Sequence, residues 1–295
     1  MTKNKGGIGT VGSNIGGQAV IEGVLMRTKD KAAIAIRKPN QKIKIKKLEI
    51  KSFQNKFFKL PLIRGIIALI ETLILGIKAL NYSANENLEE PEKKQEKISP
   101  IYFIITAIFS LILALVIFKF IPLLITQALT NKTLIKNKIL FNIIEGLLKI
   151  IILFAYILII SRMKDIQRIF QYHGAEHKVV NCYENKLPLT LQNIKKFSTI
   201  HTRCGTSFII LVLIVSIIIY SFLPSDVTFI KKLTYRILLL PLIAAISYEI
   251  IKIKKSNFLI EILTYPGTLL QKLTTKEPDE KQIEIAVKAL NALKE

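Results

Sequence analysis

The sequence predicts a mainly helical polytopic membrane protein with about four transmembrane helices, an amphipathic helix and a small N-terminal antiparallel sheet. The 295-residue chain is apolar on average, with a mean hydropathy of +0.40, yet it carries 43 Lys and Arg against 21 Asp and Glu. Its apolar residues form runs of about 20, the length that crosses a bilayer. This hydrophobicity excludes intrinsic disorder, and two cysteines in this length exclude a disulfide scaffold.

Residues 1–60 are expected to form an N-terminal tail and a small β subdomain. No apolar segment typical of a secretory signal opens the chain, so the N-terminus is expected in the cytoplasm, where cysteines stay reduced. The stretch Gly7–Gly12 spells G-x-G-x-x-G but follows no predicted strand, and is interpreted as a flexible tail. Ala19–Arg27 and Ala32–Lys38 are β-prone runs. Lys42–Lys46 alternates with a period of two after a Pro-Asn-Gln turn, which predicts an antiparallel sheet on the cytoplasmic side.

The next apolar run, residues 61–80, carries charges at Arg64, Glu71 and Lys78. A charge in mid-span costs about 2.5–3.5 kcal/mol on insertion scales. This run is therefore predicted to be an amphipathic helix at the membrane interface. The charged residues 81–99, which lack periodicity, are predicted to be a linker.

Residues 100–251 are predicted to form a four-span membrane domain. With these spans, 35 Lys and Arg fall on one side of the membrane and 6 on the other. The positive-inside rule then places both termini and the loop 162–205 in the cytoplasm of a multi-pass cell-membrane protein. This bias also accounts for the basic charge, so nucleic acid is not an expected partner, whereas the lipid bilayer is. The four predicted spans are residues 100–118, 139–161, 206–223 and 233–251.

The C-terminal segment, residues 252–295, is predicted to be cytoplasmic and helical. Tyr265-Pro266-Gly267 is expected to break the chain, and Pro278-Asp279 to open an amphipathic helix. The apolar face of that helix comprises Ile283, Ala286, Val287, Leu290 and Leu293.

The candidate site lies in the predicted cytoplasmic loop, where all three histidines fall within 29 residues. His173-Gly174-Ala175-Glu176-His177 fits the H-x-x-E-H pattern of inverted zinc peptidases. On a helix, residues four apart share a face, so His173 and His177 can hold one metal ion. Glu176 then reaches a metal-bound water as general base.

A third ligand is needed, and the sequence leaves alternatives open. His201 is favoured because histidine is the commoner ligand and is near in sequence. Glu249, a carboxylate in the last span, is the alternative that inverted zinc peptidases suggest. Cys204 offers a thiolate beside His201, and together the three histidines and Cys204 can close a structural zinc site with no open position. Cys182 is a further candidate.

Two charged residues, Glu145 and Lys149, lie four apart inside the second predicted span. They are interpreted as an ion pair that lowers the cost of burying both.

Taken together, the motifs resemble the YqhQ-like family of bacterial membrane proteins, which are described as predicted metal-dependent enzymes. The resemblance runs from about residue 16 to the C-terminus. It also draws attention to Gln18, Glu22 and Arg27; Glu22 can approach a metal from the sheet, while the flanking glycines can serve tight packing. The resemblance is carried by residues 16–27, 61–65, 170–184, 201–208, 265–267 and 273–278.

The leading hypothesis is a membrane metal-dependent hydrolase that uses Zn²⁺ and acts on a substrate at the cytoplasmic membrane surface. In this hypothesis Arg203 pairs with an anionic substrate or with Glu184. The rival hypothesis is a non-catalytic membrane scaffold or transport-related protein in which a structural zinc site pins the cytoplasmic loop.

Overall fold

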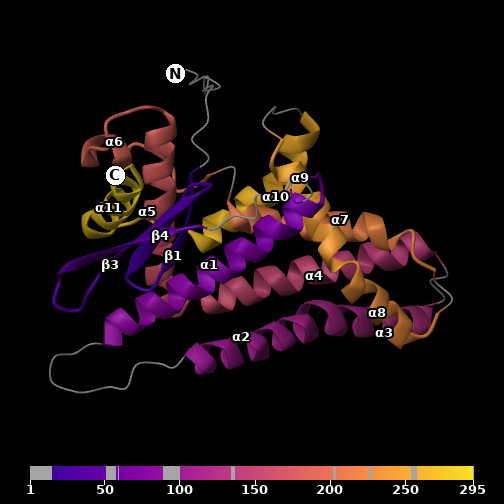
Figure 1. Ribbon diagram of the computed structural model, residues 1–295. Helices are drawn as coiled ribbons and strands as arrows, with labels where there is room; N and C mark the ends of the chain where they lie inside the picture. The colour runs from indigo at the N-terminus through magenta and orange to yellow at the C-terminus, as the bar shows by residue number, and fades with distance from the viewer. Residues whose placement is uncertain are drawn as a thin grey trace.

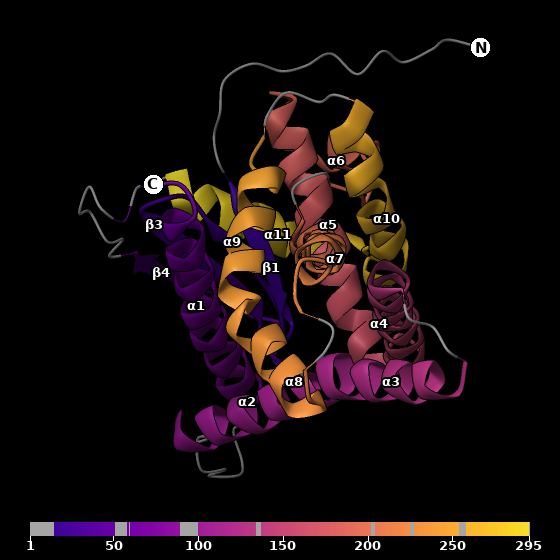
Figure 2. The ribbon, with the colours of Figure 1, turned by 90° about the vertical axis from the view of Figure 1, so that its right-hand side faces the viewer.

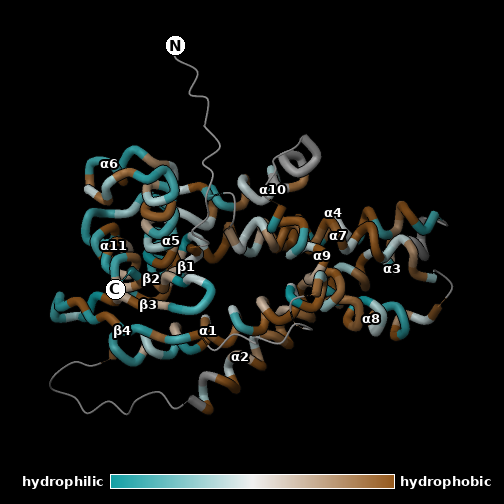
Figure 3. The backbone as a smooth tube through the Cα atoms, turned by 45° about the horizontal axis from the view of Figure 1, so that its top comes forward, coloured by the Kyte–Doolittle hydropathy of each residue, from teal (hydrophilic) through white to brown (hydrophobic). Residues whose placement is uncertain are grey.

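A computed structural model describes residues 15–50, 58, 60–88, 100–133, 137–201, 204–224, 227–253 and 258–294. The protein is mainly helical, with one small sheet near the N-terminus (Figure 1). The sheet lies beside α5, α6 (Leu191–Lys195) and α11 at one end of the molecule, and α2, α3, α4, α7 and α8 extend toward the other end. Figure 3 shows that hydrophobic residues dominate the second region. The predicted tail motif at residues 7–12 lies outside the described residues.

The predicted antiparallel sheet is confirmed, with four strands in the order β1-β2-β3-β4. The first β-prone run forms two strands rather than one, because the chain reverses at Ile21-Glu22 and Val20 pairs with Gly23. The expected turn after β3 is present, and Gln41 there has a φ of 63°. The strands are Gly16–Val20 (β1), Gly23–Arg27 (β2), Lys31–Arg37 (β3) and Ile43–Glu49 (β4).

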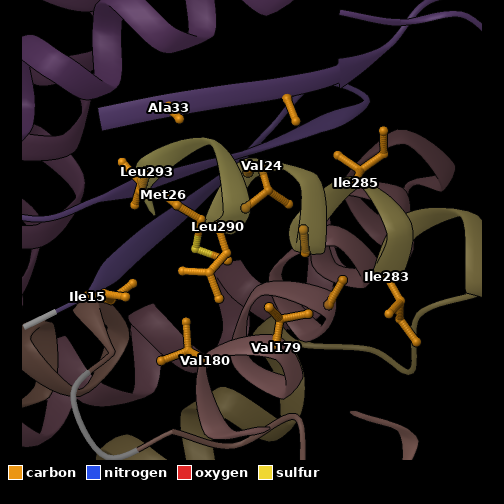
Figure 4. Packing of buried hydrophobic residues seen from close by; sticks show 14 of the residues in the cluster. Ile15, Val24, Met26, Ala33, Val179, Val180, Ile283, Ile285, Leu290 and Leu293 are labelled. Carbon is orange, nitrogen blue, oxygen red and sulfur yellow. The ribbon is translucent and has the colours of Figure 1, made fainter. Parts of the chain in front are cut away.

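Helices cover both faces of the sheet. On one face, Val24 and Met26 pack with α5 (Lys164–Glu184) and α11 (Glu280–Lys294), as Figure 4 shows. On the other face, Leu25 and Ile34 pack against α1 (Ile63–Leu88). Side chains alternate between the faces of a strand, so β2 and β3, apolar at nearly every position, are buried on both sides. The sheet therefore forms the central layer of three.

The helix α1 is longer than predicted. It continues through residues 81–88, which the absence of periodicity had assigned to a linker. Glu86 in this extension is buried and pairs with Lys38 and Lys44 of the sheet region, at 3.1 and 2.7 Å. Tertiary ion pairing thus extends the helix where its own sequence pattern is weak. In Figure 2, α1 runs beside α9.

Two described helices are long and apolar enough to cross a membrane. One runs over Ile104–Leu129, and the other is α4 (Lys138–Ile160). A third span is possible by length if α8 (Phe229–Leu238) and α9 (Leu240–Ile251), bent by 42°, act together. The helix α7 (Gly205–Tyr220) is apolar but has only 16 residues.

The described helices therefore differ from the four predicted spans in three places, of which the short helix α7 is one. The first predicted span does not end at residue 118, because α2 (Pro100–Leu115) passes through a π-helical turn, η2 (Val116–Phe120), into α3 (Ile121–Thr133). Most of the expected external loop 119–138 is accordingly helical. The last predicted span is divided where α8 meets α9 at Leu239.

The predicted break at Tyr265-Pro266-Gly267 is wrong, because α10 (Phe258–Thr274) continues through Pro266. Gly267 packs directly against Ser207 of α7, and this close helix contact holds the proline-containing turn in place. The amphipathic C-terminal helix is confirmed. Its first turn carries a capping box, in which Asp279 and Gln282 exchange side-chain to backbone hydrogen bonds of 2.7 and 2.9 Å.

Candidate metal centre

The H-x-x-E-H motif lies on one helix, α5, as its spacing predicts. The chain that follows α10 lies across this helix, and the backbone N–H of Lys276 donates to the carbonyl of Phe170 at 2.9 Å. A Cβ on Gly174 would meet the Lys276 carbonyl oxygen at 2.0 Å. The glycine inside the motif therefore allows the end of α10 to lie directly against α5.

Three side chains from two parts of the chain converge beside this helix. The ligand atoms of His173, His177 and Cys204 all lie within 4.8 Å of one another. The Nε2 atom of His173 lies 3.3 Å from the Sγ atom of Cys204, and the two imidazole centroids are 4.4 Å apart. Cys204 is positioned as the N-cap residue of α7, where its sulfur accepts from the N–H of Thr206 at 3.5 Å. Among the His, Cys, Asp and Glu side chains that the structure describes, these three form the group that could hold a metal ion.

Backbone carbonyls orient both imidazoles. The Nδ1 atom of His173 lies 2.8 Å from the carbonyl oxygen of Thr274, and that of His177 lies 2.5 Å from the carbonyl oxygen of Thr199. A carbonyl oxygen can only accept, so each Nδ1 carries a proton, and in the neutral imidazole the lone pair is then on Nε2. Metal-binding histidines are commonly held in this way. Burial lowers the pKa of His177, which favours the neutral imidazole that a metal requires.

The carboxylate of Glu176 lies between the two imidazoles, with Oε2 3.9 Å from each Nε2 atom. It is buried, and burial raises the pKa of this carboxyl group, while the nearby histidines and a hydrogen bond from the Gly17 backbone act in the opposite direction. A Cβ on Gly17 would meet Glu176 Cγ at 2.6 Å. The first strand therefore closes one side of the site, and only glycine fits there.

Gly17 is the functional residue that the motif analysis missed. The feature of the sequence that indicates this residue is the glycine-rich stretch before Ala19, which the family resemblance links to tight packing. Gly23 also fits that interpretation, since a Cβ there would meet the carbonyl oxygen of Ala35 at 2.5 Å, whereas Gly16 has open space around it.

His201, the favoured third ligand, is not part of the converging group. Its Nε2 atom lies 3.2 Å from a carboxylate oxygen of Glu184, and its ring centroid is 5.6 Å from that of His177. Its backbone is held by Gln271, which donates to the His201 carbonyl and accepts from its N–H, both at 2.9 Å. The chain around His201 therefore directs the imidazole toward Glu184 and brings Cys204 to the other two histidines.

The remaining sequence candidates have other partners. The Glu249 carboxylate pairs with the guanidinium of Arg64 and accepts from the N–H of Leu62. The Glu22 carboxylate pairs with Arg168 and accepts from the hydroxyl of Tyr172 at 3.2 Å. None of these carboxylates is directed at the histidine pair.

Cys182 is also separate from the cluster. Its thiol lies 3.6 Å from the carbonyl oxygen of Pro188, and burial raises its pKa. Arg203 lies outside the described residues. Gln18 and Arg27, which the resemblance highlighted, contact α1 at Gly76 and Thr72.

The fold and this cluster together define a class of protein. Apolar helices of membrane-spanning length are connected to a small layered part of strands and helices, and this part carries a His/His/Cys group. The family model described as "Protein of unknown function (DUF1385)" matches residues 60–295, and the chain belongs to this family. It is 37% identical over 293 residues to "Uncharacterized protein YqhQ" of Bacillus subtilis (strain 168), an alignment that covers 94% of this chain and 91% of that protein. The expected YqhQ-like membership is thus confirmed. No solved structure matches the chain.

Proposed function

We propose that the protein is a membrane metal-dependent hydrolase, with zinc held by His173, His177 and Cys204. The observation that carries the proposal is the convergence of two imidazoles and one thiol, with a buried carboxylate beside both imidazoles. For tetrahedral zinc, with Zn–N near 2.0 Å and Zn–S near 2.3 Å, the N···S distance is about 3.5 Å. The observed 3.3 Å between His173 Nε2 and Cys204 Sγ is close to that distance.

A three-ligand site leaves a coordination position for water, which a hydrolytic site needs and a structural site lacks. Bound zinc would supply Lewis acidity and lower the pKa of its water toward 7. The rest of the chemistry is assigned to Glu176, whose carboxylate lies beside both imidazoles, with Oε2 3.9 Å from each Nε2 atom. Its buried position and raised pKa suit a group that accepts a proton and then delivers it to a leaving group.

The ligand set revises the expectation from sequence. Cys204 replaces His201 as the proposed third ligand, and His201 is assigned to orientation of the loop through Glu184 and Gln271. The non-catalytic alternative requires the His201 ring to leave Glu184 and complete a closed tetrahedron. The present position of His201 favours the open site.

Metal analysis of the purified full-length chain tests the ligand set. His173→Ala, His177→Ala and Cys204→Ser should each lose most bound zinc, because each removes one of three protein ligands. Glu176→Gln and His201→Ala should retain it. A zinc-free wild-type protein, or a His201→Ala variant as empty as His177→Ala, would contradict the proposal.

A second experiment separates the open site from the closed one. The protein is loaded with cobalt(II), and its visible spectrum is recorded before and after addition of acetohydroxamate, which needs a vacant position to bind. A spectral change is expected. An unchanged spectrum in a metal-loaded protein would assign the site to the scaffold hypothesis.

For the membrane domain we propose four spans, with both termini and residues 162–205 in the cytoplasm of the cell membrane. The proposal rests on the basic-residue bias of the predicted spans, 35 against 6, which becomes 35 against 5 when Lys119 is counted within the helix Ile104–Leu129. It places the metal centre at the cytoplasmic membrane surface. A cysteine introduced at Asn131 should react with an impermeant maleimide in intact cells, while one introduced at the exposed Asn185 should not. Labelling at position 185 alone would reverse the topology.

A further inference from the structure

A second group of polar side chains is buried among the helices, at the other end of α7 from Cys204. Glu145 and Lys149 come from α4, Lys119 from η2, Arg236 from α8, and Tyr220 from the end of α7. Each is at most 6% exposed. The helices α4 and α7 meet closely here, because Gly146 faces Ile217 with no room for a Cβ. We refer to these five residues as the Tyr220 cluster.

The single carboxylate of the cluster serves two cations. Lys149 donates to Glu145 at 2.6 Å, which confirms the predicted i,i+4 pair. Arg236 also binds Glu145, through Nε at 2.9 Å and Nη2 at 2.5 Å. The second partner, Arg236, comes from a helix far away in sequence, so the spacing of Glu145 and Lys149 could not reveal it.

The third cation, Lys119, has no carboxylate among its described contacts. Its Nζ atom donates to the hydroxyl of Tyr220 at 3.1 Å, and that hydroxyl donates in turn to the carbonyl of Arg236 at 3.0 Å. The Nζ atoms of Lys119 and Lys149 lie 5.4 and 4.9 Å from the centroid of the tyrosine ring. A phenol ring and hydroxyl attract a cation but do not neutralise it.

The described cluster therefore places three basic side chains around one carboxylate in an apolar setting, and it carries an excess of two positive charges when all three are protonated. Uncompensated buried charge is expensive, and charged residues within membrane segments mark functional sites by default. Lys119 is near the middle of the apolar helix Ile104–Leu129 and lies in its π-helical turn, a distortion that is frequent at functional sites. The surplus of basic side chains points to an anionic ligand.

We propose that the Tyr220 cluster binds a phosphate group of the monoester type. Such a group carries a charge of about −1.5 to −2 at pH 7, which balances the three basic side chains beside Glu145 in their protonated forms. Its several oxygens can accept from the ammonium groups of Lys119 and Lys149 together, in charge-assisted hydrogen bonds. The group can belong to a lipid such as phosphatidic acid or to soluble phosphate. This site is independent of the proposed hydrolytic function.

The first test measures thermal unfolding of the purified full-length chain in detergent with and without inorganic phosphate, at constant ionic strength set with chloride. A ligand that binds only the folded state raises the unfolding temperature in a concentration-dependent way. Wild type should show this rise. Lys119→Met should weaken phosphate binding at least tenfold, and Lys119→Arg should restore it. Lys231→Met, an exposed lysine of α8, is the matched control and should behave as wild type.

The second test distinguishes the sources of the phosphate. The same variants are placed in nanodiscs of phosphatidylcholine, with or without phosphatidic acid. Stabilisation by phosphatidic acid but not by inorganic phosphate assigns the site to a lipid headgroup, and the reverse result assigns it to a soluble phosphate.

Two outcomes would overturn the proposal. One is that neither phosphate source raises the unfolding temperature of wild type. The other is that Lys119→Met responds as wild type does. Because Lys119→Met removes an unneutralised buried charge, it is expected to fold. If it does not, the wild-type comparison of phosphate with chloride still decides the question.

Discussion

The metal centre and the Tyr220 cluster lie at opposite ends of α7, which begins after Cys204 and ends at Tyr220. A helix of 16 residues separates them by about 24 Å. At the metal centre, the side chains are positioned by two backbone carbonyls and by Gly17 of strand β1. In the Tyr220 cluster, side chains position one another through ion pairs.

The difference shows how two buried polar groups meet the cost of desolvation. The metal centre binds each Nδ1 to a backbone carbonyl, so the imidazole N–H groups are paired before metal binds. The Tyr220 cluster buries three basic side chains and depends on Glu145 as its only described carboxylate. We therefore expect substitutions in the cluster to affect stability most, and substitutions at the metal centre to affect ligand binding.

The largest effect is expected from Glu145→Gln, which removes the carboxylate shared by Lys149 and Arg236. Breaking a buried ion pair by removing one partner destabilises by about 3–5 kcal/mol. Glu249→Gln is the matched control, since its pair with Arg64 is partly exposed and should contribute only about 0–1 kcal/mol. Denaturant unfolding in detergent compares the two. Equal losses in the free energy of unfolding would show that Glu145 contributes no more to stability than the partly exposed Glu249.

A smaller effect is expected from Gly174→Ala. The new Cβ would lie 2.0 Å from the Lys276 carbonyl, so the end of α10 must shift and release His173 from Thr274. Overpacking of this kind costs about 1–3 kcal/mol, and zinc affinity should fall with it. Gly16→Ala, with nothing within 4 Å, should change neither quantity. Unfolding and zinc titration measure both; an unaffected Gly174→Ala would refute the close contact.

The metal-free protein should show a pH effect from Glu176. Burial raises the pKa of this carboxyl in the folded state, so its ionisation opposes folding. Stability should decline as pH rises from the unfolded-state pKa of about 4.3 through the folded value. Glu176→Gln should remove that decline and be more stable than wild type at pH 8 but not at pH 4. Parallel pH profiles for the two proteins would contradict this prediction.

The smallest effect concerns the two thiols. Burial raises the pKa of Cys182, so less thiolate is present at pH 8 and alkylation by iodoacetamide should be slow in the folded protein. The Cys204→Ser variant isolates this thiol, and mass spectrometry follows its modification with and without denaturant. Rapid alkylation of the folded variant would show that the turn at residues 182–188 opens readily.

Local patterns in the sequence predicted much of the structure. The i,i+4 spacing of His173 and His177 needed only a helix, the alternation of Lys42–Lys46 needed only a strand, and the capping residue Asp279 acts on its own first turn. These features depend on residues a few positions apart. For the same reason, the pair of Glu145 and Lys149 was predictable.

Long-range contacts decided the rest. Pro266 continues a helix because Gly267 packs on Ser207, and Cys204 rather than His201 joins the histidines because Gln271 and Glu184 hold the His201 loop elsewhere. Arg236 reaches Glu145 across 91 residues. The sequence by itself therefore determined which chemistry-bearing residues the chain has and which face of a helix each occupies. The tertiary structure alone decided which of them meet, because a contact between distant segments depends on packing that no local pattern encodes.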